Sequence, residues 1–306
     1  VVKADGLAAG KGVILAETEQ QAIEAVNDML AGNAFGEAGH RVVIEEFMTG
    51  EEASFICMID GDNILPMATS QDHKRAFEGD TGPNTGGMGA YSPAPVVTDE
   101  VHNKVITQVI QPVVDAMNAA GHPYTGFLYA GLMIDDAGDP YVIEFNCRFG
   151  DPETQPILMR LQSSIVDLVT AGLAGQLPKE ANWDERPALG IVIASKGYPE
   201  TSSKGDVISG LPELDDQQSV KVFHAGTDFT KEVENLDINI NTQSANAQND
   251  SDKEIVTNGG RVVCVTALAD SILNAQQAAL SVAGAISFEG AHYRRDIGYQ
   301  AIARED

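Results

Sequence analysis

The chain has 306 residues, and its 45 acidic against 19 basic side chains give a formal net charge of −26. This length predicts two domains with a sizeable core. The acidic balance argues against nucleic acid as a partner, because phosphate backbones attract basic surfaces. The three cysteines form no CxxC pair, so a reducing compartment and no structural zinc are expected. No apolar run approaches the ~20 residues of a membrane span, and we expect a soluble cytoplasmic protein that does not bind membranes.

Helix and strand patterns alternate in the first half of the chain. Strands are predicted over 1–3, 12–16, 41–47, 53–59, 127–134 and 140–148. One helix is predicted after Thr18, which has capping-box spacing, and a second from Thr98 to about Ala120, bent at Pro112. Asp151 and Pro152 predict the start of another helix. The glycine-rich segment 69–95 is too long for a simple connection and is predicted to be a functional loop.

The pattern changes near residue 187 and predicts a smaller α+β unit. Strands are predicted over 188–195, 205–208, 220–224 and 261–267, and a last strand near 297–303. A helix is predicted over 271–286. Residues 232–254 are rich in Asn, Asp, Gln and Ser, so they are predicted to form a mobile insertion.

The first stretch with chemical potential is "VVKADGLAAGKGV" at the start of the chain. The spacing from Gly6 to Lys11 departs from the Walker A motif, and no helix follows directly as a dinucleotide-binding fingerprint requires. What remains is a flexible loop between two strands, whose N–H groups can close over phosphates beside Lys3 and Lys11. An ordinary hairpin with exposed lysines fits the same residues equally well.

The stretch "YVIEFNCRFGDPE" carries a stronger signal. A strand period of two puts one set of side chains on an apolar, core-facing side, namely Tyr141, Ile143, Phe145 and Cys147. The other side then carries Glu144, Asn146 and Arg148. Glu144 and Asn146 supply hard oxygen ligands of the kind that suits Mg²⁺ on nucleotide phosphates, and Arg148 can neutralise a phosphoryl group or a carboxylate. A polar strand side facing solvent is the alternative, although Asp151 and Glu153 concentrate further charge nearby.

Two further stretches carry weaker signals. "VIEEFMTGEE" ends a predicted strand in acids and an aromatic residue, which can contact adenine and ribose, although a surface hairpin explains it as well. "SQDHKRAFEGDTGPNTGGMGAYSP" places charged residues before a glycine run that permits close approach to a ligand. A disordered polar loop is the alternative for this second stretch.

Taken together, these stretches resemble the ATP-grasp ligases, and among them the glycinamide ribonucleotide synthetase family. The runs "IEEFMTGEEASF", "QDHKR", "GPNTGGMGAYSP" and "NCRFGDPETQP" carry the resemblance, which covers nearly the whole chain except 232–254. It implies an α/β (α+β) ATP-grasp fold with a lid subdomain over 1–58, a core subdomain over 59–186 and a smaller C-terminal α+β domain over 187–306. It also implies that the family's N-terminal nucleotide-fold-like domain is absent here, so that the lid is incomplete.

The resemblance implies an enzyme that joins glycine to 5-phosphoribosylamine with ATP, through glycyl phosphate, in purine biosynthesis. ATP would be bound by Lys3, Gly6, Gly10, Lys11, Gly12, Glu45, Glu46, Phe47, Met48 and Glu52. The substrates would be bound by Asp72, His73, Thr85, Gly86, Gly87, Met88 and Gly89. Glu144 and Asn146 would bind Mg²⁺ or Mn²⁺, and the catalytic residues would be Arg148, Asp151 and Lys74. A monomer is expected.

Two departures from the family pattern and two alternatives accompany this interpretation. Many ATP-grasp enzymes carry another metal-binding acid on the strand before Glu144, where this sequence has the run "FLYAGLMI". The chain also begins inside the ATP-binding unit of the family pattern, which predicts a fragment that is inactive by itself. The alternatives are another ligase of the superfamily, such as a phosphoribosyl-aminoimidazole carboxylating enzyme, and a nucleotide-binding regulatory module without turnover.

Overall fold

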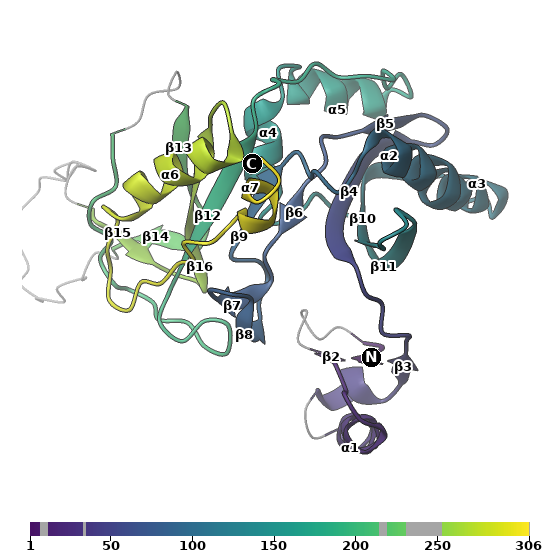
Figure 1. Ribbon diagram of the computed structural model, residues 1–306, viewed down its shortest axis with the longest axis horizontal. Coiled ribbons are helices and arrows are strands. Elements are labelled where there is room, and N and C mark those ends of the chain that lie inside the picture. Colours follow the sequence, from purple (N-terminus) through teal and green to yellow (C-terminus); the bar gives the residue numbers. More distant parts are fainter. Residues whose placement is uncertain (7–11, 33–34, 214–218, 231–252, 306) are drawn as a thin grey trace, which may run out of the picture.

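The structure is a computed structural model that describes residues 1–6, 12–32, 35–213, 219–230 and 253–305. Figure 1 shows a small N-terminal unit, a central unit built on an antiparallel sheet, and a C-terminal unit built on a second sheet. This arrangement is a mixed α/β fold. Within the described ranges, no helix is both long and apolar enough to cross a membrane.

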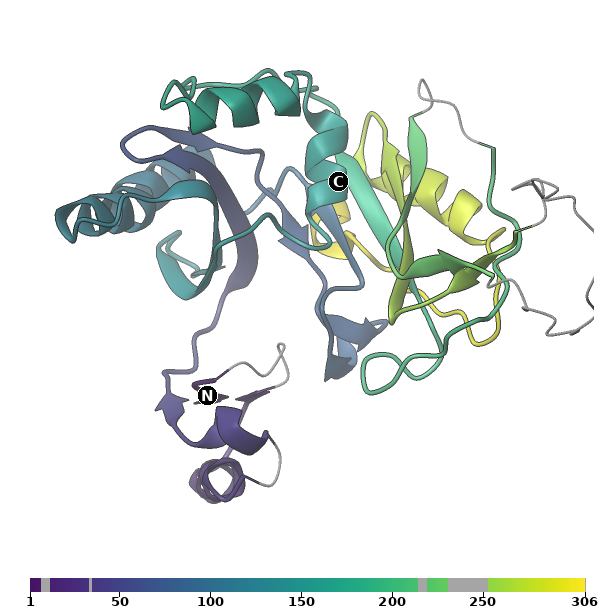
Figure 2. The ribbon, with the colours of Figure 1, turned by 180° about the vertical axis from the view of Figure 1, so that it is seen from behind.

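The N-terminal unit consists of a three-stranded sheet covered by one helix. Its strands lie in the order β2 (Val13–Ile14), β1 (Val2–Ala4) and β3 (Val42–Ile44). Helix α1 (Glu19–Leu30) begins as predicted, with the Thr18 side chain accepting a hydrogen bond from the Gln21 backbone N–H. Ala25 and Met29 of α1 pack on Val2, which gives the unit a small core of its own. Figures 1 and 2 both show this unit set apart from the rest and joined to it through the segment before β4.

The central sheet has the order β11 (Pro140–Asn146), β10 (Thr125–Ile134), β4 (Glu51–Asp60) and β5 (Ile64–Pro66). Alternate residues of β4 face opposite sides, as a strand period of two requires. Phe55 packs toward the helical segment formed by α2 (Asp99–Val105), η2 (Ile106–Ile110) and α3 (Gln111–Ala119). Ile56 packs on the other side toward α4 (Thr154–Arg160) and α5 (Ile165–Leu173). Helices on both faces bury β4 and β10 along most of their length.

The helix predicted from Thr98 to Ala120 is present, but its irregularity differs from a simple proline bend. The segment η2 is a π-helical turn that ends just before Pro112. Proline has no N–H and its ring clashes with the preceding turn, and a wider turn accommodates both effects without ending the helix. Gly121 follows the helix with a φ of 78°, a conformation that favours glycine.

The C-terminal sheet has five strands in the order β13 (Val220–His224), β16 (Arg261–Leu268), β12 (Ala188–Ala194), β9 (Gly89–Ser92) and β6 (Gln71–Asp72). Helix α6 (Ile272–Ala283) covers it, and α7 (Tyr299–Ile302) follows near the C-terminus. Two hairpins complete the unit, β7 (Arg75–Phe77) with β8 (Thr81–Asn84), and β14 (Thr227–Phe229) with β15 (Ile255–Thr257). The predicted functional loop 69–95 therefore contains four short strands, and two of them extend this sheet.

Two predicted strands of this unit are wrong. Residues 299–302 form α7 instead of a strand, because Gly298 adopts a φ of 85° and accepts a helical hydrogen bond from the Ile302 N–H. Residues 205–208 contribute isolated bridges, such as Val207 with Val256, and no regular strand. The predicted insertion 232–254 lies outside the described residues except for its last two positions.

A buried arginine ties the β7–β8 hairpin to the end of the chain. The Arg294 side chain is fully buried, and its guanidinium donates to Asp80 at 2.7 Å and to both oxygens of Asp296 at 2.8 Å. It also donates to the Arg75 carbonyl at 3.0 Å. Because a buried charge is stable only when it is paired and hydrogen-bonded, these contacts fix the hairpin on the C-terminal unit.

Gly50 allows the chain to turn sharply into β4. Its φ is 146°, and a Cβ atom there would lie 2.2 Å from the Ile134 carbonyl oxygen. We expect Gly50→Ala to lower the free energy of unfolding by at least about 2 kcal/mol. The backbone conformation is strained for alanine, and the added methyl group would collide with the Ile134 carbonyl. Gly121→Ala is the matched control, because φ is 78° there and a Cβ atom would have no other atom within 4 Å. This variant should lower the free energy of unfolding by only about 1 kcal/mol. Urea unfolding of both variants measures the difference, and equal losses would contradict the close-approach argument.

Candidate active site

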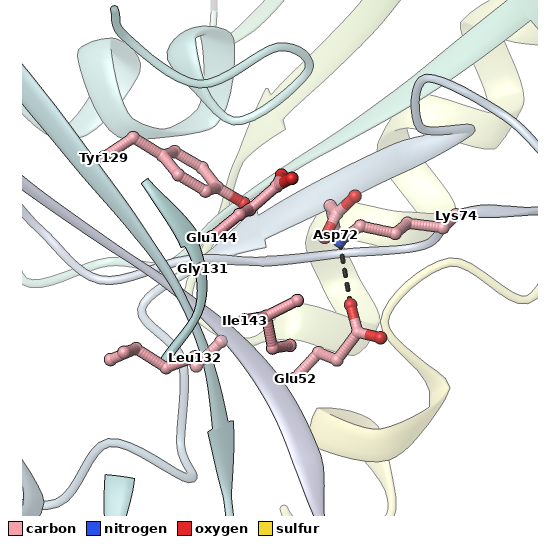
Figure 3. Close-up of a pocket in the computed structure, with 9 residues that line it drawn as sticks. Glu52, Asp72, Lys74, Tyr129, Gly131, Leu132, Ile143 and Glu144 are labelled. Atoms are coloured by element: carbon pink, nitrogen blue, oxygen red, sulfur yellow. Dashed lines mark hydrogen bonds and ion pairs between the residues drawn. The ribbon is translucent and has the colours of Figure 1, made fainter. Parts of the chain in front are cut away.

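A pocket lies where the central sheet meets the segment leading into the C-terminal sheet. It is lined by Glu52, Ala53, Asp72, Lys74, Tyr129, Gly131, Leu132, Ile143 and Glu144. Figure 3 shows the acidic side chains of β4, β6 and β11 gathered around this space with Lys74, which lies between β6 and β7. Four of the residues predicted for the site, namely Glu52, Asp72, Lys74 and Glu144, are thus brought together from three separate stretches.

Lys74 sits between two carboxylates. Its Nζ atom lies 2.7 Å from Asp72 Oδ1 and 2.8 Å from Glu52 Oε2, and 37% of its side chain remains exposed. Burial by itself would lower the pKa of Lys74, but the charges of Asp72 and Glu52 outweigh burial and hold the pKa well above its usual range. Lys74 therefore stays protonated and can present positive charge to an anionic ligand.

The predicted metal pair lies on β11, although the strand differs from the predicted one. Asn146 Nδ2 donates to Glu144 Oε1 at 3.0 Å, so the two side chains lie side by side. A β-bulge separates the pairs Gly131–Glu144 and Leu132–Val142, which leaves Ile143 without a partner on β10. The bulge breaks the strand period and brings Ile143 and Glu144 to the same pocket.

The prediction that one side of this strand is apolar and faces the core is wrong. Tyr141 is 49% exposed, Phe145 is 40% exposed, and Cys147 is exposed as well. β11 is an edge strand of the central sheet, and the bulge turns its side chains out of strict alternation. These apolar side chains therefore form no part of the described core.

The donor set on β11 fits a magnesium-type ion. Glu144 offers a carboxylate and Asn146 an amide oxygen, and such ions are commonly held by one or two carboxylates together with substrate phosphates and water. The strand before Glu144 lacks the further metal-binding acid of many ATP-grasp enzymes, and the structure shows the same, because Gly131 pairs with Glu144 and adds no ligand. Among the described residues, no group of three or more His, Cys, Asp or Glu side chains is placed to hold a metal ion. Nucleotide phosphates would therefore have to supply the remaining ligands.

Lys3 links the N-terminal unit to β11. Its Nζ atom lies 2.5 Å from Glu45 Oε2 and 3.3 Å from the Ile143 carbonyl oxygen. The Gly12 carbonyl accepts a hydrogen bond from the Ala4 N–H at 2.8 Å. Gly6 packs closely on Ala38, because a Cβ atom at Gly6 would lie 2.6 Å from the Ala38 Cα. Gly10 and Lys11 lie outside the described residues. The two ends of the predicted phosphate loop are thus held together beside Lys3.

The predicted adenine and ribose contacts lie on the connection between the units. Glu45, Glu46, Phe47 and Met48 precede β4 without regular structure. The Phe47 side chain is 64% exposed, and Glu45 is paired with Lys3. Glu52, predicted to accept from ribose, is engaged by Lys74 at the pocket wall.

The residues predicted to bind substrate divide into two groups. Asp72 lines the pocket, and Gly87 lies beside it, because a Cβ at Gly87 would be 3.6 Å from Asp72 Oδ2. Thr85 closes the loop, with its hydroxyl donating to the Lys74 carbonyl and accepting from the Gly87 N–H.

Three other predicted substrate ligands, His73, Met88 and Gly89, face the interior. His73 is 3% exposed and accepts a hydrogen bond from the Gly298 N–H at its Nε2 atom, while Met88 is fully buried in the C-terminal core. Gly89 abuts Gly190 of β12, since a Cβ would lie 2.5 Å from the Gly190 oxygen.

The two remaining predicted catalytic residues follow β11. Arg148 is exposed and donates to the neighbouring Phe149 carbonyl at 2.8 Å. Asp151 does not cap a helix as predicted, because α4 begins at Thr154 and the Asp151 carboxylate accepts from Arg261 at 2.7 Å. Both side chains remain accessible from solvent.

A buried acidic network beneath the pocket was missed by the sequence analysis. Glu153 is 2% exposed and accepts a hydrogen bond from Ser54 Oγ at 2.7 Å, and the Ser54 Oγ atom lies 2.9 Å from the Tyr129 hydroxyl. Burial, together with the nearby charge of Asp72, raises the pKa of Glu153. The run "GDPE" contains Glu153, but the burial of Glu153 depends on contacts with β4 and β10, which are distant in sequence.

Glu153 gives a prediction for the pH dependence of stability. With its pKa raised above the ordinary value of 4.5, Glu153 stays protonated in the folded protein where the unfolded chain is ionised. The unfolded state then binds fewer protons, so Glu153 lowers stability progressively as pH rises above that value. Glu153→Gln cannot ionise and still offers Ser54 an acceptor oxygen. We expect this variant to gain stability over the wild type as the pH rises above the ordinary glutamate value of 4.5, by at most about 1.4 kcal/mol per pH unit.

Urea unfolding across this pH range measures the gain, and exposed Glu180→Gln is the control. A stability difference that does not change with pH would contradict the protonated state of Glu153.

Comparisons with known proteins establish the family. The model of the phosphoribosylglycinamide synthetase ATP-grasp (A) domain matches residues 1–154, and the model of the C domain of the same enzyme matches residues 188–300. The chain belongs to the phosphoribosylglycinamide synthetase family. The resemblance found in the sequence is therefore confirmed, and so is the ATP-grasp fold.

Individual relatives agree with the family. The phosphoribosylamine–glycine ligase of Yersinia pestis is 60% identical over 305 residues, which are 99% of this chain and 66% of that protein. The structure of the phosphoribosylamine–glycine ligase of Thermotoga maritima matches with a TM-score of 0.81 at 34% identity, over 97% of this chain and 68% of that one. A biotin carboxylase domain from Hydrogenobacter thermophilus matches with a TM-score of 0.62 at 14% identity, over 95% of this chain and 58% of that one, and supports the fold alone. The chain thus spans about two thirds of the length of its curated relatives.

Proposed function

We propose that this chain carries the nucleotide and ligation sites of a cytoplasmic enzyme that joins glycine to 5-phosphoribosylamine. The products would be glycinamide ribonucleotide, ADP and phosphate, in a step of purine biosynthesis. The observation that carries the proposal is the pocket in which Glu144 of β11 faces Lys74 between its two carboxylates. Membership of the phosphoribosylglycinamide synthetase family supports it.

In the first step, an oxygen of the glycine carboxylate attacks the γ-phosphorus of ATP. The bond from that phosphorus to the β,γ-bridging oxygen breaks, ADP leaves, and glycyl phosphate forms. Lys3 and the Gly6–Gly12 loop bind the phosphates, while Glu45 to Met48 and Glu52 contact adenosine. Lys74 and Arg148 supply positive charge near the transferring group, and such placed charges provide most of the catalysis in phosphoryl transfer.

In the second step, the amine of 5-phosphoribosylamine attacks the carbonyl carbon of glycyl phosphate. The carbon–oxygen bond to phosphate breaks, phosphate leaves with its bonding electrons, and the amine loses one proton. Asp151 and the Thr85–Gly87 run hold the two substrates at this end of the site, because joining two bound reactants depends chiefly on their orientation. A Mg²⁺ or Mn²⁺ ion at Glu144 and Asn146 would neutralise phosphate charge. A monomer suffices, since all these groups belong to one chain.

Product analysis tests this function. The sample is a protein of the relatives' full length that contains this chain, called the full-length protein below. With ATP, glycine and 5-phosphoribosylamine it should form glycinamide ribonucleotide and ADP in equal amounts. A product formed only with bicarbonate and an aminoimidazole ribonucleotide would instead support the carboxylating alternative. ATP binding without any product from either substrate set would support a regulatory module.

A further inference from the structure

An arginine and a tyrosine of the C-terminal unit reach across to the substrate end of the site. Arg261 begins β16, the strand between β12 and β13 in the C-terminal sheet. Its Nη2 atom donates to Asp151 Oδ2 at 2.7 Å, and its Nη1 atom donates to the carbonyls of Gly86 at 2.7 Å and Asp151 at 3.0 Å. The Tyr198 hydroxyl accepts a hydrogen bond from the Gly86 N–H at 2.9 Å.

These contacts leave little freedom for the groups that they hold. Both the N–H and the carbonyl of Gly86 are engaged, and a Cβ at Gly86 would lie 2.9 Å from the Arg261 guanidinium carbon. The Tyr198 ring packs on Gly260, where a Cβ would lie 2.4 Å from Tyr198 Cδ2. Glycines therefore permit the close approach on both sides of the contact. The planar guanidinium fixes the direction of its hydrogen bonds as well as their number.

Asp151 and the Gly86 peptide, which Arg261 and Tyr198 hold, lie next to the pocket. A Cβ at Gly87 would lie 2.4 Å from Pro152 Cδ and 3.6 Å from Asp72 Oδ2, so the glycine run, the Asp151–Pro152 pair and the pocket wall are in mutual contact. The Asp151 carboxylate is 60% exposed. Within the described part of the chain, only Arg261 donates to it, so its other oxygen is free to accept from a ligand.

We propose that Arg261 and Tyr198 are positioning residues that hold Asp151 and the Gly86 peptide for the amine-bearing substrates. The inference rests on the proposed function. It adds that the ligation end of the site is completed by the C-terminal unit, outside the segment matched by the ATP-grasp domain model. The nucleotide end, formed by the N-terminal unit and β4, makes none of these contacts.

Steady-state kinetics of the full-length protein test the inference. Arg261→Met should lower kcat about 100-fold and raise KM for glycine about tenfold, because misplaced reacting groups lose their orientation. KM for ATP should change by less than about twofold. Arg261→Lys should recover part of the loss, since it keeps the charge without the fork, and Tyr198→Phe should show a smaller loss of the same kind. Glu289→Gln, which breaks an exposed pair with Lys196 in the same unit, is the control and should leave kinetics unchanged.

A double variant separates positioning from general destabilisation. If Arg261 acts through Asp151, Arg261→Met combined with Asp151→Asn should be little slower than Asp151→Asn alone. Multiplying losses, or a rise in KM for ATP that matches that for glycine, would overturn the inference.

Hydrogen exchange gives a readout that does not depend on turnover. The Gly86 amide should exchange at least about tenfold faster in Tyr198→Phe, while amides of β10 stay protected. Unchanged exchange at Gly86 would overturn the inference even with full activity in the wild type. A wild type that makes no glycinamide ribonucleotide would instead overturn the proposed function, and with it the role in ligation.

Discussion

Truncating Glu144 or Asn146, the two proposed metal ligands on β11, is expected to abolish most turnover while leaving the fold intact. In the full-length protein, Glu144→Ala and Asn146→Ala should each lower kcat about 100-fold or more, as the loss of one electrostatic contact to a reacting phosphoryl group does. Glu144 is exposed and Asn146 only partly buried, so truncation opens no core cavity and the thermal midpoint should shift little. Asp136→Asn, in the exposed turn between β10 and β11, is the matched control and should keep full activity.

Binding of Mn²⁺ in the presence of ATP gives a second measurement for the same variants. Electron paramagnetic resonance should show weaker Mn²⁺ binding in Glu144→Ala than in Asp136→Asn. Near-normal turnover of Glu144→Ala at saturating Mg²⁺ would rule out the assignment of the metal ligands.

Local features of the fold were predictable because they depend on neighbouring residues. The Thr18 cap of α1 requires only a hydroxyl three residues before a free N–H. The long helix after Thr98 follows from its apolar period and from Gly121 at its end. The Glu144–Asn146 pair was visible for the same reason, since two residues of one strand separated by one position lie on the same side unless a bulge intervenes.

Features that depend on distant pairing were not predictable. The bulge at Ile143 appears only in the register of β11 against β10. Strands β6 and β9 join a sheet whose other strands lie about a hundred residues or more further along the chain, so the segment 69–95 gave only a loop signal. The buried contact of Ser54 with Glu153 spans 99 residues. The burial of His73 was not predictable for the same reason, because the Gly298 N–H that donates to it lies 225 residues away.

The 306-residue chain by itself is expected to bind ATP weakly and to make no measurable glycinamide ribonucleotide. It spans about two thirds of its relatives' length, and the remaining third of that length is expected to contribute contacts to phosphate and substrate. The N-terminal unit has a small core, and large apolar side chains near it are exposed, including Ile44 at 71% and Phe47 at 64%. Loss of one charged contact costs a few kcal/mol, or about two decades of affinity. Loss of a substrate wall also removes the orientation that makes amine attack fast.

Calorimetry of ATP binding and product release, measured for the 306-residue chain and for the full-length protein, test this expectation. The full-length protein should bind ATP at least about 100-fold more tightly and alone form product. The exposed sheet edge of β3 should also make the shorter chain more prone to self-association, because unpaired strand edges template further pairing. Analytical ultracentrifugation should therefore find it aggregated at concentrations where the full-length protein is not. Ligation by the 306-residue chain at the rate of the full-length protein would show that the nucleotide, metal and ligation sites assemble completely from these 306 residues.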